Sequence, residues 1–231
     1  MHCLRSMALL VGLTLLVGST QPVAVAGEGK KAKLAPLKID LPIPKFIGTR
    51  KDIKPRPTLE KPSAKPRPPF LAPEGTRNLA LKRPVTSSDD NPIVGDLELV
   101  TDGDKEAMQD TYVELAPGCQ WVQVDLGQRS TIHAIVVWHF HLKPYIFHDV
   151  VVQVADDADF IANVRTLYNN DYDNSSGLGL GRDKEYVESY EGRLIDAKGV
   201  EARFVRLYSK DSTDAEGNQY TEVEVYGKPA Q

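Results

Sequence analysis

The stretch that decides the fold is Trp121-Val-Gln-Val-Asp-Leu-Gly127, in which apolar and polar residues alternate. Side chains at every second position of a β-strand point to the same face. Val122, Val124 and Leu126 are therefore expected to face a core, with the polar residues between them facing solvent. This is the pattern of a half-buried strand in an antiparallel sheet.

The same period of two returns later in the chain, in residues 202–208 and 221–227. Residues 132–138 and 149–155 are near-continuous runs of apolar, largely β-branched residues, which suit central strands. Clusters of glycine, aspartate and asparagine separate these segments, as turns require, and no long helical pattern is present. Many short strands without helices predict an all-β fold, an antiparallel β-sandwich of the jelly-roll kind.

Residues 1–26 have the composition of a secretory signal peptide. Arg5 supplies the positive start, residues 7–17 form an apolar core, and Ala24-Val-Ala26 offers the small residues of a cleavage site. The apolar run is short for a membrane-spanning helix, so no transmembrane segment is expected after signal cleavage. The sequence therefore predicts a protein that is secreted or placed in the periplasm or cell envelope.

Residues 27–75 form a region rich in proline and lysine. Between residues 27 and 73 the chain has ten prolines and a net charge of +8, whereas residues 74–231 carry a net charge of −13. The proline-rich region is predicted to be extended and mostly disordered, as a basic tether or a plain spacer. The acidic remainder would repel phosphates, which argues against nucleic acid and leaves neutral glycans, cations or basic partners.

Five sequence landmarks follow one another in the order of a known family. From residue 76 to residue 229 the chain resembles the discoidin domain, or coagulation factor 5/8 type C domain. This galactose-binding-like jelly roll is similar to family 32 carbohydrate-binding modules. The resemblance implies a domain without catalytic activity that binds sugars, phospholipid head groups or proteins through loops at one end of the sandwich. The landmarks are Asn78-Leu-Ala80 with Pro84-Val85, Thr101-Asp-Gly103, Trp121 to Gly127, Ala202 to Tyr208 and Glu222 to Gly227.

The resemblance also implies a structural calcium ion. Bacterial sugar-binding members of the family often hold one between the Asp-Gly loop and the carboxylate that opens the last strand. Hard oxygen ligands on a turn suit Ca²⁺, and clustered carboxylates repel one another without a cation. In the alternative interpretation, Asp102-Gly103 is only a turn and the last carboxylate lies on the surface. The metal ligands matched in this sequence are Asp102, Asp104, Thr111 and Glu222.

A histidine-rich loop at residues 139–148 is the first candidate ligand-binding segment. Imidazoles and a lysine donate hydrogen bonds to sugar hydroxyls, and an aromatic ring packs against the apolar face of a pyranose. Three imidazoles also suit Zn²⁺ or Cu²⁺. A third interpretation is a packed loop whose histidines bond to the backbone. The predicted ligand-binding residues are His139, His141, Lys143, Tyr145, Phe147 and His148.

Residues 168–176 are the second candidate segment, because they carry a dense set of amide and carboxylate groups. Such groups suit the recognition of hydroxyls. Asp171 and Asp173 alternate as ligands do in calcium loops, and a folded turn is the remaining alternative. The predicted ligand-binding residues here are Tyr168, Asn170 and Tyr172.

No catalytic activity is expected from the sequence. It contains no Gly-x-Ser-x-Gly or His-Glu-x-x-His motif, and no carboxylate pair is marked by its context. We predict a secreted recognition module that binds carbohydrate, such as a cell-surface polysaccharide, through loops at one end of the β-sandwich. The alternative is a protein-interaction or adhesion domain with another envelope protein as its partner. Phospholipid binding is less favoured, because anionic membranes repel an acidic domain.

Overall fold

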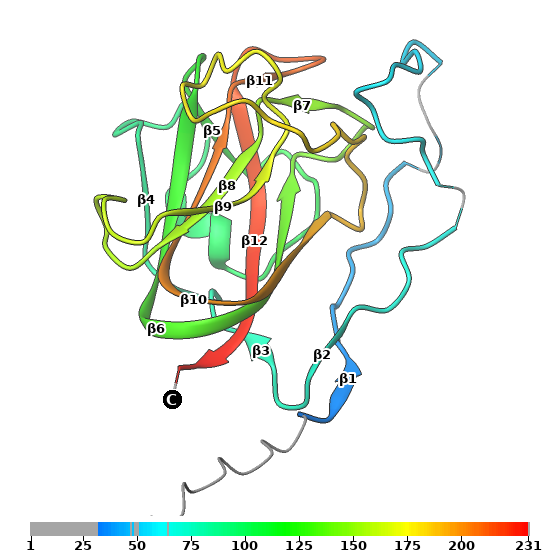
Figure 1. Ribbon diagram of the computed structural model, residues 1–231. Helices are drawn as coiled ribbons and strands as arrows, with labels where there is room; N and C mark the ends of the chain where they lie inside the picture. The colour runs from blue at the N-terminus through cyan, green and yellow to red at the C-terminus, as the bar shows by residue number, and fades with distance from the viewer. Residues whose placement is uncertain (1–31, 47, 49–50, 64, 231) are drawn as a thin grey trace, which may run out of the picture. The chain divides into compact units, whose positions relative to one another are not determined.

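The computed structural model describes residues 32–46, 48, 51–63 and 65–230, so the predicted signal peptide lies outside the described residues. Almost every regular element is a β-strand (Figure 1), which confirms the predicted all-β fold. No helix within the described ranges has the length and apolar character that a membrane crossing needs. The elements are β1 (Leu34–Pro36), β2 (Leu71–Pro73), β3 (Arg77–Asn78), β4 (Val85–Ser87), a 3₁₀ helix η1 (Leu97–Thr101), β5 (Val113–Leu115), β6 (Gln120–His139), β7 (Phe147–His148), β8 (Val151–Ala155), β9 (Arg165–Asn169), β10 (Arg193–Ser209), β11 (Asp211–Ser212) and β12 (Asn218–Pro229).

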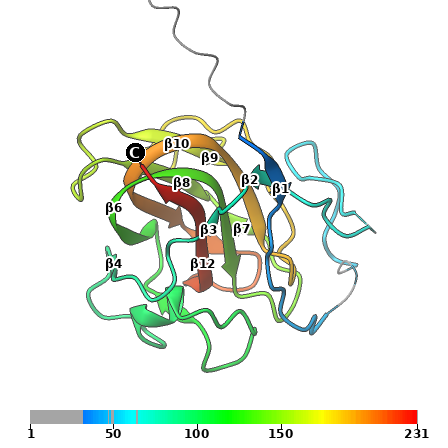
Figure 2. The ribbon, with the colours of Figure 1, turned by 90° about the horizontal axis from the view of Figure 1, so that it is seen from below.

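Two long, bent strands hold the sandwich together. The main sheet has the order β3-β12-β6-β10-β8-β9, with β4 added to β6 and β5 added to β12, and all its pairs are antiparallel. The first part of β6 pairs with β4 and its last part with β12, so the strand passes from one layer to the other. Gly127, with a φ of 80°, lies before the corner, and β10 follows the bend with two register shifts (Figure 2).

The main core lies between the two layers and follows the alternation seen in the sequence. Val122, Val124 and Leu126 are all buried, as their period of two predicts. The later strands contribute in the same way, because residues two positions apart share a face. Among the buried apolar residues of this cluster are Ile132, Ile135, Val137, Val152, Val154, Val205, Leu207, Tyr220, Val223 and Val225.

A second, smaller core covers the outer face of the sheet. Ala134, Val136, Trp138 and Tyr226 are the buried members of this cluster, and they point away from the main core. The apolar residues that pack against them are Leu37, Ile39, Phe70 and Leu194. Three of these four belong to residues 32–75, which we call the N-terminal segment. The segment therefore completes the hydrophobic packing of the sandwich.

Part of residues 27–75, the region predicted to be mostly disordered, lies along the sandwich in the structure. Within the described part of this region, β1 pairs with β2 along three residues, and both run beside the sandwich (Figures 1 and 2). Lys45 forms an ion pair with Glu106, and Arg56 forms one with Glu185. The proline-rich region is basic and the rest of the chain is acidic, so electrostatic attraction favours contact between this region and the sandwich. The predicted extended conformation is present where β1 and β2 pair, whereas residues 51–52 and 57–58 form turns.

Candidate functional site

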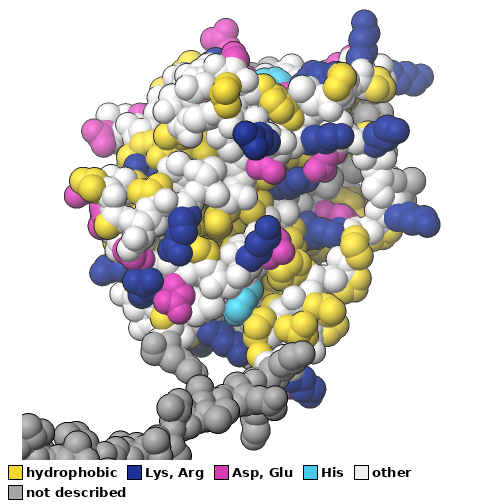
Figure 3. Space-filling model, in the orientation of Figure 1, with side chains coloured by type: hydrophobic (Ala, Val, Ile, Leu, Met, Phe, Trp, Pro, Cys, Tyr) yellow, Lys and Arg dark blue, Asp and Glu magenta, His cyan; other side chains and the backbone are white. Residues whose placement is uncertain are grey.

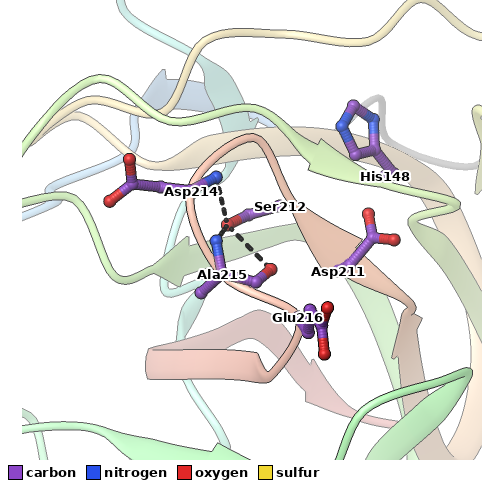
Figure 4. Close-up of a pocket in the computed structure, with 6 residues that line it drawn as sticks. All are labelled: His148, Asp211, Ser212, Asp214, Ala215 and Glu216. Carbon is purple, nitrogen blue, oxygen red and sulfur yellow. Dashed lines mark hydrogen bonds between the residues drawn. The ribbon is translucent and has the colours of Figure 1, made fainter.

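Three loops gather at one end of the sandwich, where β7 and β11 form a small separate sheet (Figure 1). In that sheet His148 pairs with Asp211, and Phe147 pairs with Ser212. A pocket of about 400 Å³ opens beside this pair of strands. The residues that line it are His148, Asp211, Ser212, Asp214, Ala215 and Glu216 (Figure 4).

A tight turn after β11 gives the pocket its shape. The Ser212 N–H donates to the carbonyl of Ala215 at 2.9 Å, and the Ser212 Oγ accepts from the N–H groups of Asp214 and Ala215 at 3.3 and 3.1 Å. Within the turn, the Thr213 N–H donates to the Ile146 carbonyl at 2.9 Å, and the Thr213 hydroxyl accepts from the Ile146 N–H at 3.2 Å. The turn is thus tied to the loop before β7 by these two bonds, and its side chains are held on a rigid support.

The pocket is acidic and rich in hydrogen-bond acceptors. Asp211, Glu216 and His148 lie on one side of the turn, whereas the carboxylate of Asp214 points away from them (Figure 4). The His148 Nδ1 lies 3.0 Å from Glu185 Oε1, so this ring is itself held in place by a carboxylate. No lysine or arginine is among the lining residues. Such a pocket can accept hydrogen bonds from hydroxyl or amine groups and disfavours anions.

The predicted ligand surface at residues 139–148 is mostly core. Tyr145 and Phe147 are 6% and 1% exposed, so neither ring offers a face to a sugar, and the structure contradicts that role. His139 is buried against Phe147, with ring centroids 4.3 Å apart. Lys143 is exposed, and His148 reaches the pocket. The rings of Tyr145 and Phe147 are buried because the segment that carries them fills space between the two layers of the sandwich.

The three histidines bond to three different partners and do not form a metal site among the described residues. The Nδ1 of His139 lies 2.7 Å from a carboxylate oxygen of Glu188. The Nε2 of His141 lies 2.9 Å from the Lys105 carbonyl, and burial lowers the pKa of this ring. His148 bonds to Glu185. The interpretation as a packed loop fits best, with carboxylates as well as backbone as partners.

The second predicted segment is also largely structural. Tyr168 is buried, and its hydroxyl donates to the Lys184 carbonyl at 2.5 Å. The buried side chain of Asn170 accepts a hydrogen bond from the Val150 N–H at 2.7 Å. Tyr172 alone of these three is exposed, at 38%, and its hydroxyl donates to the Asp183 carbonyl at 2.6 Å. Of the predicted residues in this segment, only Tyr172 presents a ring to solvent.

A group of three carboxylates lies beside these loops. Asp149, Asp171 and Asp173 each place one oxygen within 4.8 Å of the other two. Burial raises the pKa of Asp171, but hydrogen bonds from Ser176 and other groups outweigh it and lower that pKa. The Lys210 ammonium lies 3.6 Å from Asp149. The carboxylates are therefore already compensated in part by a cation and by N–H and O–H donors of the chain.

Glu222 is the most unusual of the predicted metal ligands. Its side chain is fully buried, one oxygen accepts from the Gly103 N–H at 3.1 Å, and the other has no hydrogen-bond partner within the described structure. Burial, with the negative charges of Glu224 and Asp102, raises the pKa of Glu222 to about 9, against the Gly103 hydrogen bond and Lys105. A buried carboxylate in such surroundings favours a proton or a cation.

The other predicted metal ligands shape the loop above Glu222. Asp102 accepts from the Asp104 N–H at 2.7 Å, and Asp104 accepts from the Glu106 N–H at 2.9 Å. The Thr111 hydroxyl donates to the Glu106 carbonyl and accepts from the Met108 N–H. The structure thus brings Glu222 under the Asp102-Gly103 turn, where its carboxylate accepts the Gly103 N–H. Within the described ranges, however, the carboxylates of Asp102, Asp104 and Glu222 do not approach one another as closely as the three described above. The donor set is hard oxygen, which fits Ca²⁺.

The chain was compared with known proteins. No family model matches it, and no curated protein does. Among solved structures, it is similar to a chitosan-binding module of a chitosanase/glucanase from Paenibacillus sp. IK-5, with 22% identity and a TM-score of 0.48, over 66% of this chain and 99% of that one. It is similar to a fucose-binding module from Streptococcus pneumoniae, with 16% identity and a TM-score of 0.46, over 65% and 97%. A family 89 glycoside hydrolase from Clostridium perfringens matches with 18% identity and a TM-score of 0.49, over 66% of this chain and 15% of the hydrolase.

Sequence reasoning missed most of the pocket. Asp211, Ser212 and Asp214 carry no motif, and residues 216–218 indicate only a turn. The pocket exists because β11 pairs with β7, which lies more than sixty residues earlier in the chain. Three acidic residues within six positions, Asp211, Asp214 and Glu216, were the one available signal, and they do not show which other loop lies opposite.

Proposed function

We propose that this protein is a non-catalytic recognition module that binds carbohydrate in the pocket beside β7 and β11. The observation that supports the proposal is the pocket, with a volume of about 400 Å³ and a lining of carboxylates, a hydroxyl and an imidazole. This volume falls within the range of small-ligand sites. Sugar hydroxyls are hydrogen-bond donors, and carboxylate oxygens held on a rigid turn are suitable acceptors.

The chemistry of the pocket favours binding over catalysis. Its only side-chain hydroxyl, that of Ser212, is bonded within its own turn and not to His148. A serine nucleophile needs an adjacent base, and the imidazole here is bonded to Glu185. The lining therefore supports a recognition role, in which these side chains orient a ligand by hydrogen bonds and transfer no proton to it.

The proposal includes export and a partner at the cell surface. The composition of residues 1–26 supports secretion or placement in the periplasm or cell envelope. A polysaccharide is the partner that suits the site, because neutral or cationic sugars are not repelled by acidic residues.

A structural Ca²⁺ is the second part of the proposal. Asp102, Asp104, Thr111 and Glu222 would hold it, and the unbonded buried oxygen of Glu222 is the observation in its favour. The ion would supply the positive charge that this carboxylate needs. It would also fix the Asp102–Thr111 loop to β12.

A glycan array probed with the full chain tests the sugar proposal. The variants Asp211→Asn and Glu216→Gln each remove a charged acceptor from the pocket, and we expect about a tenfold loss of affinity for the bound glycan in each. Asp159→Asn is the matched control, because Asp159 is exposed and lies outside the pocket. The proposal fails if no glycan is bound, or if both pocket variants bind like the control.

Adding Ca²⁺ to metal-stripped protein tests the cation proposal. With free Ca²⁺ at about one hundred times its dissociation constant, linkage predicts a gain near 2.7 kcal/mol, or a rise in Tm of about 5–10 °C for a chain of this size. Mg²⁺ is the control ion, because it demands a tighter octahedral site. An unchanged Tm with Ca²⁺ rules out the structural ion.

A further inference from the structure

Residues 56–60 lie on the sandwich as a tight turn that leads into a single β-bridge, because the Leu59 N–H donates to the Arg56 carbonyl at 3.1 Å. Leu59 and Glu185 form a parallel β-bridge. The Glu60 N–H donates to the Glu185 carbonyl at 2.8 Å, and the Glu185 N–H donates to the Thr58 carbonyl at 2.9 Å. The backbone of Thr58 and Glu60 is therefore bonded on both sides to the backbone of Glu185, and such main-chain bonds contribute to affinity for a peptide.

Each end of residues 56–60 carries a charged side chain that forms an ion pair with an oppositely charged side chain on the sandwich. The Arg56 guanidinium donates to both oxygens of Glu185, at 2.9 and 2.7 Å, and the Thr58 hydroxyl adds a bond of 3.0 Å. At the other end Glu60 accepts two bonds from Arg193, each of 2.8 Å. The order of charges fixes the direction of the segment, because a reversed peptide would place like charges together.

The sandwich side of this contact is held in place by its own residues. The Arg193 guanidinium lies over the rings of Tyr168 and Tyr186, at 5.1 and 4.9 Å from their centroids. His148 bonds to Glu185 from the other side at 3.0 Å. The charged side chains of Glu185 and Arg193 are thus held in position by groups outside residues 56–60, so the binding site is preorganised. Tyr168 and Tyr186 therefore orient Arg193, a role that differs from the ligand contact predicted for Tyr168.

We propose that Glu185, Arg193 and the residues that support them form a peptide-recognition site, occupied in this chain by its own residues 56–60. The partner that fits is a protein segment that forms the same turn and has the order basic residue, any residue, hydroxyl, apolar residue, acidic residue. A peptide is favoured over a glycan because the site bonds to backbone N–H and C=O groups and neutralises both signs of charge. Basic and acidic side chains alternate where the N-terminal segment lies on the sandwich (Figure 3).

The ligand segment is suited to such binding and to release. Pro57 is the second residue of the turn, where the fixed φ of proline is favoured, so less entropy is lost on docking. Leu59, 5% exposed, is its buried anchor. The side chains of Arg56 and Glu60 remain 41% and 42% exposed, so their ion pairs are partly screened by solvent. A tethered segment has an effective concentration of the order of 1 mM, so a free peptide competes only when the tethered one is weakened.

The test uses the full chain carrying Arg56→Ala and Glu60→Ala, and a labelled peptide of residues 54–62, Lys-Pro-Arg-Pro-Thr-Leu-Glu-Lys-Pro. Amide exchange at Glu185 shows whether the site has opened. We expect faster exchange in the variant, and peptide affinity at least about tenfold higher than for the unchanged chain. A control peptide of the same composition, with its Arg and Glu exchanged, should bind at least about tenfold more weakly.

Three results would overturn the proposal. The first is equal affinity for the two peptides, which would show that the order of charges is not read. The second is an open site, by amide exchange, that binds no peptide. The third is unchanged exchange in the variant, which would show that the charged ends do not hold residues 56–60 in place. An unchanged circular dichroism spectrum confirms that the variant is folded, which we expect because neither side chain belongs to the core.

Discussion

Two buried carboxylates of this molecule have opposite surroundings. Glu185 accepts hydrogen bonds from Arg56 and Thr58 and lies 3.0 Å from a ring nitrogen of His148, whereas Glu222 accepts one bond, from the Gly103 N–H. Burial raises the pKa of Glu185, but these partners outweigh it and lower the pKa to about 2. Burial raises the pKa of Glu222 to about 9.

The comparison shows that burial alone does not say what a carboxylate does. Glu185 is already neutralised by a distant part of the same chain, so it is a docking point. Glu222 is buried among other negative charges, so in its charged form it destabilises the folded state unless a cation binds. The two sites should therefore respond in opposite ways to pH and to mutation.

The largest expected effect is the pH dependence of stability without Ca²⁺. Because the folded pKa of Glu222 is about 9 and its ordinary value is 4.5, the folded state retains a proton that the unfolded state loses, and stability falls as pH rises through this range. Each pH unit lowers the free energy of unfolding by about 1.36 kcal/mol, so the loss between pH 5 and pH 8 is about 4 kcal/mol. Urea unfolding at several pH values measures it.

Ca²⁺ and the low-pH range sharpen this prediction. Saturating Ca²⁺ should abolish the fall, since the bound ion replaces the proton. Glu185 acts in the opposite sense: its folded pKa of about 2 gives stability that is complete above pH 4.5 and lost as pH falls toward 2. Stability that rises from pH 5 to pH 8 in metal-free protein would contradict the account of Glu222.

Removing Glu185 should have the next largest effect. The change Glu185→Ala leaves Arg56 and His148 without their carboxylate and frees residues 56–60, and we expect a loss of about 3 kcal/mol in the free energy of unfolding. Glu201→Ala is the control, because its ion pair with Arg129 is about half exposed on both sides and should change stability by less than about 0.5 kcal/mol. If both variants lose the same amount, Glu185 is an ordinary surface carboxylate.

Glu222→Gln should act in the opposite direction. At pH 8 without Ca²⁺ the folded state has to keep a proton on Glu222 that the unfolded state loses, and a neutral amide removes this cost, so a gain of about 1–2 kcal/mol is expected. The same change should remove the rise in Tm that Ca²⁺ produces. Asp90→Asn, at an exposed carboxylate outside the predicted metal ligands, should leave both quantities unchanged. A less stable Glu222→Gln protein in metal-free buffer would refute this reading.

The sequence predicts the strands of the sandwich well because the signal is local. Val122, Val124 and Leu126 alternate with polar residues, and an alternation over seven residues says which face is buried whatever lies elsewhere. The resemblance also singled out Glu222 as a partner of the Asp102-Gly103 loop, through a cation. Its full burial was not foreseen, since nothing in the sequence shows that Glu222 faces inward rather than outward.

The rest depends on contacts between distant residues. Arg56 and Glu185 are 129 positions apart, and proline-rich composition alone gives no hint that this stretch docks. Tyr145 and Phe147 look like ligand residues because they share a loop with histidines, yet they fill the core. The pocket residues Asp211 and Glu216 look like an ordinary turn. In each case a side chain's role is set by the segment opposite it.

Arg193→Lys is the smallest expected effect and the finest test of the Glu185 side of the comparison. A lysine keeps the positive charge but loses the two parallel bonds to Glu60 and the flat contact with the rings of Tyr168 and Tyr186. We expect a loss of about 1 kcal/mol in the free energy of unfolding, with faster amide exchange at Glu60. Arg203→Lys, which keeps the charge beside Asp125 on another face, is the control for exchange at Glu60 and should leave it unchanged. If Arg193→Lys also leaves that exchange unchanged, charge alone holds the acidic end of the segment, and the guanidinium geometry contributes nothing to peptide recognition.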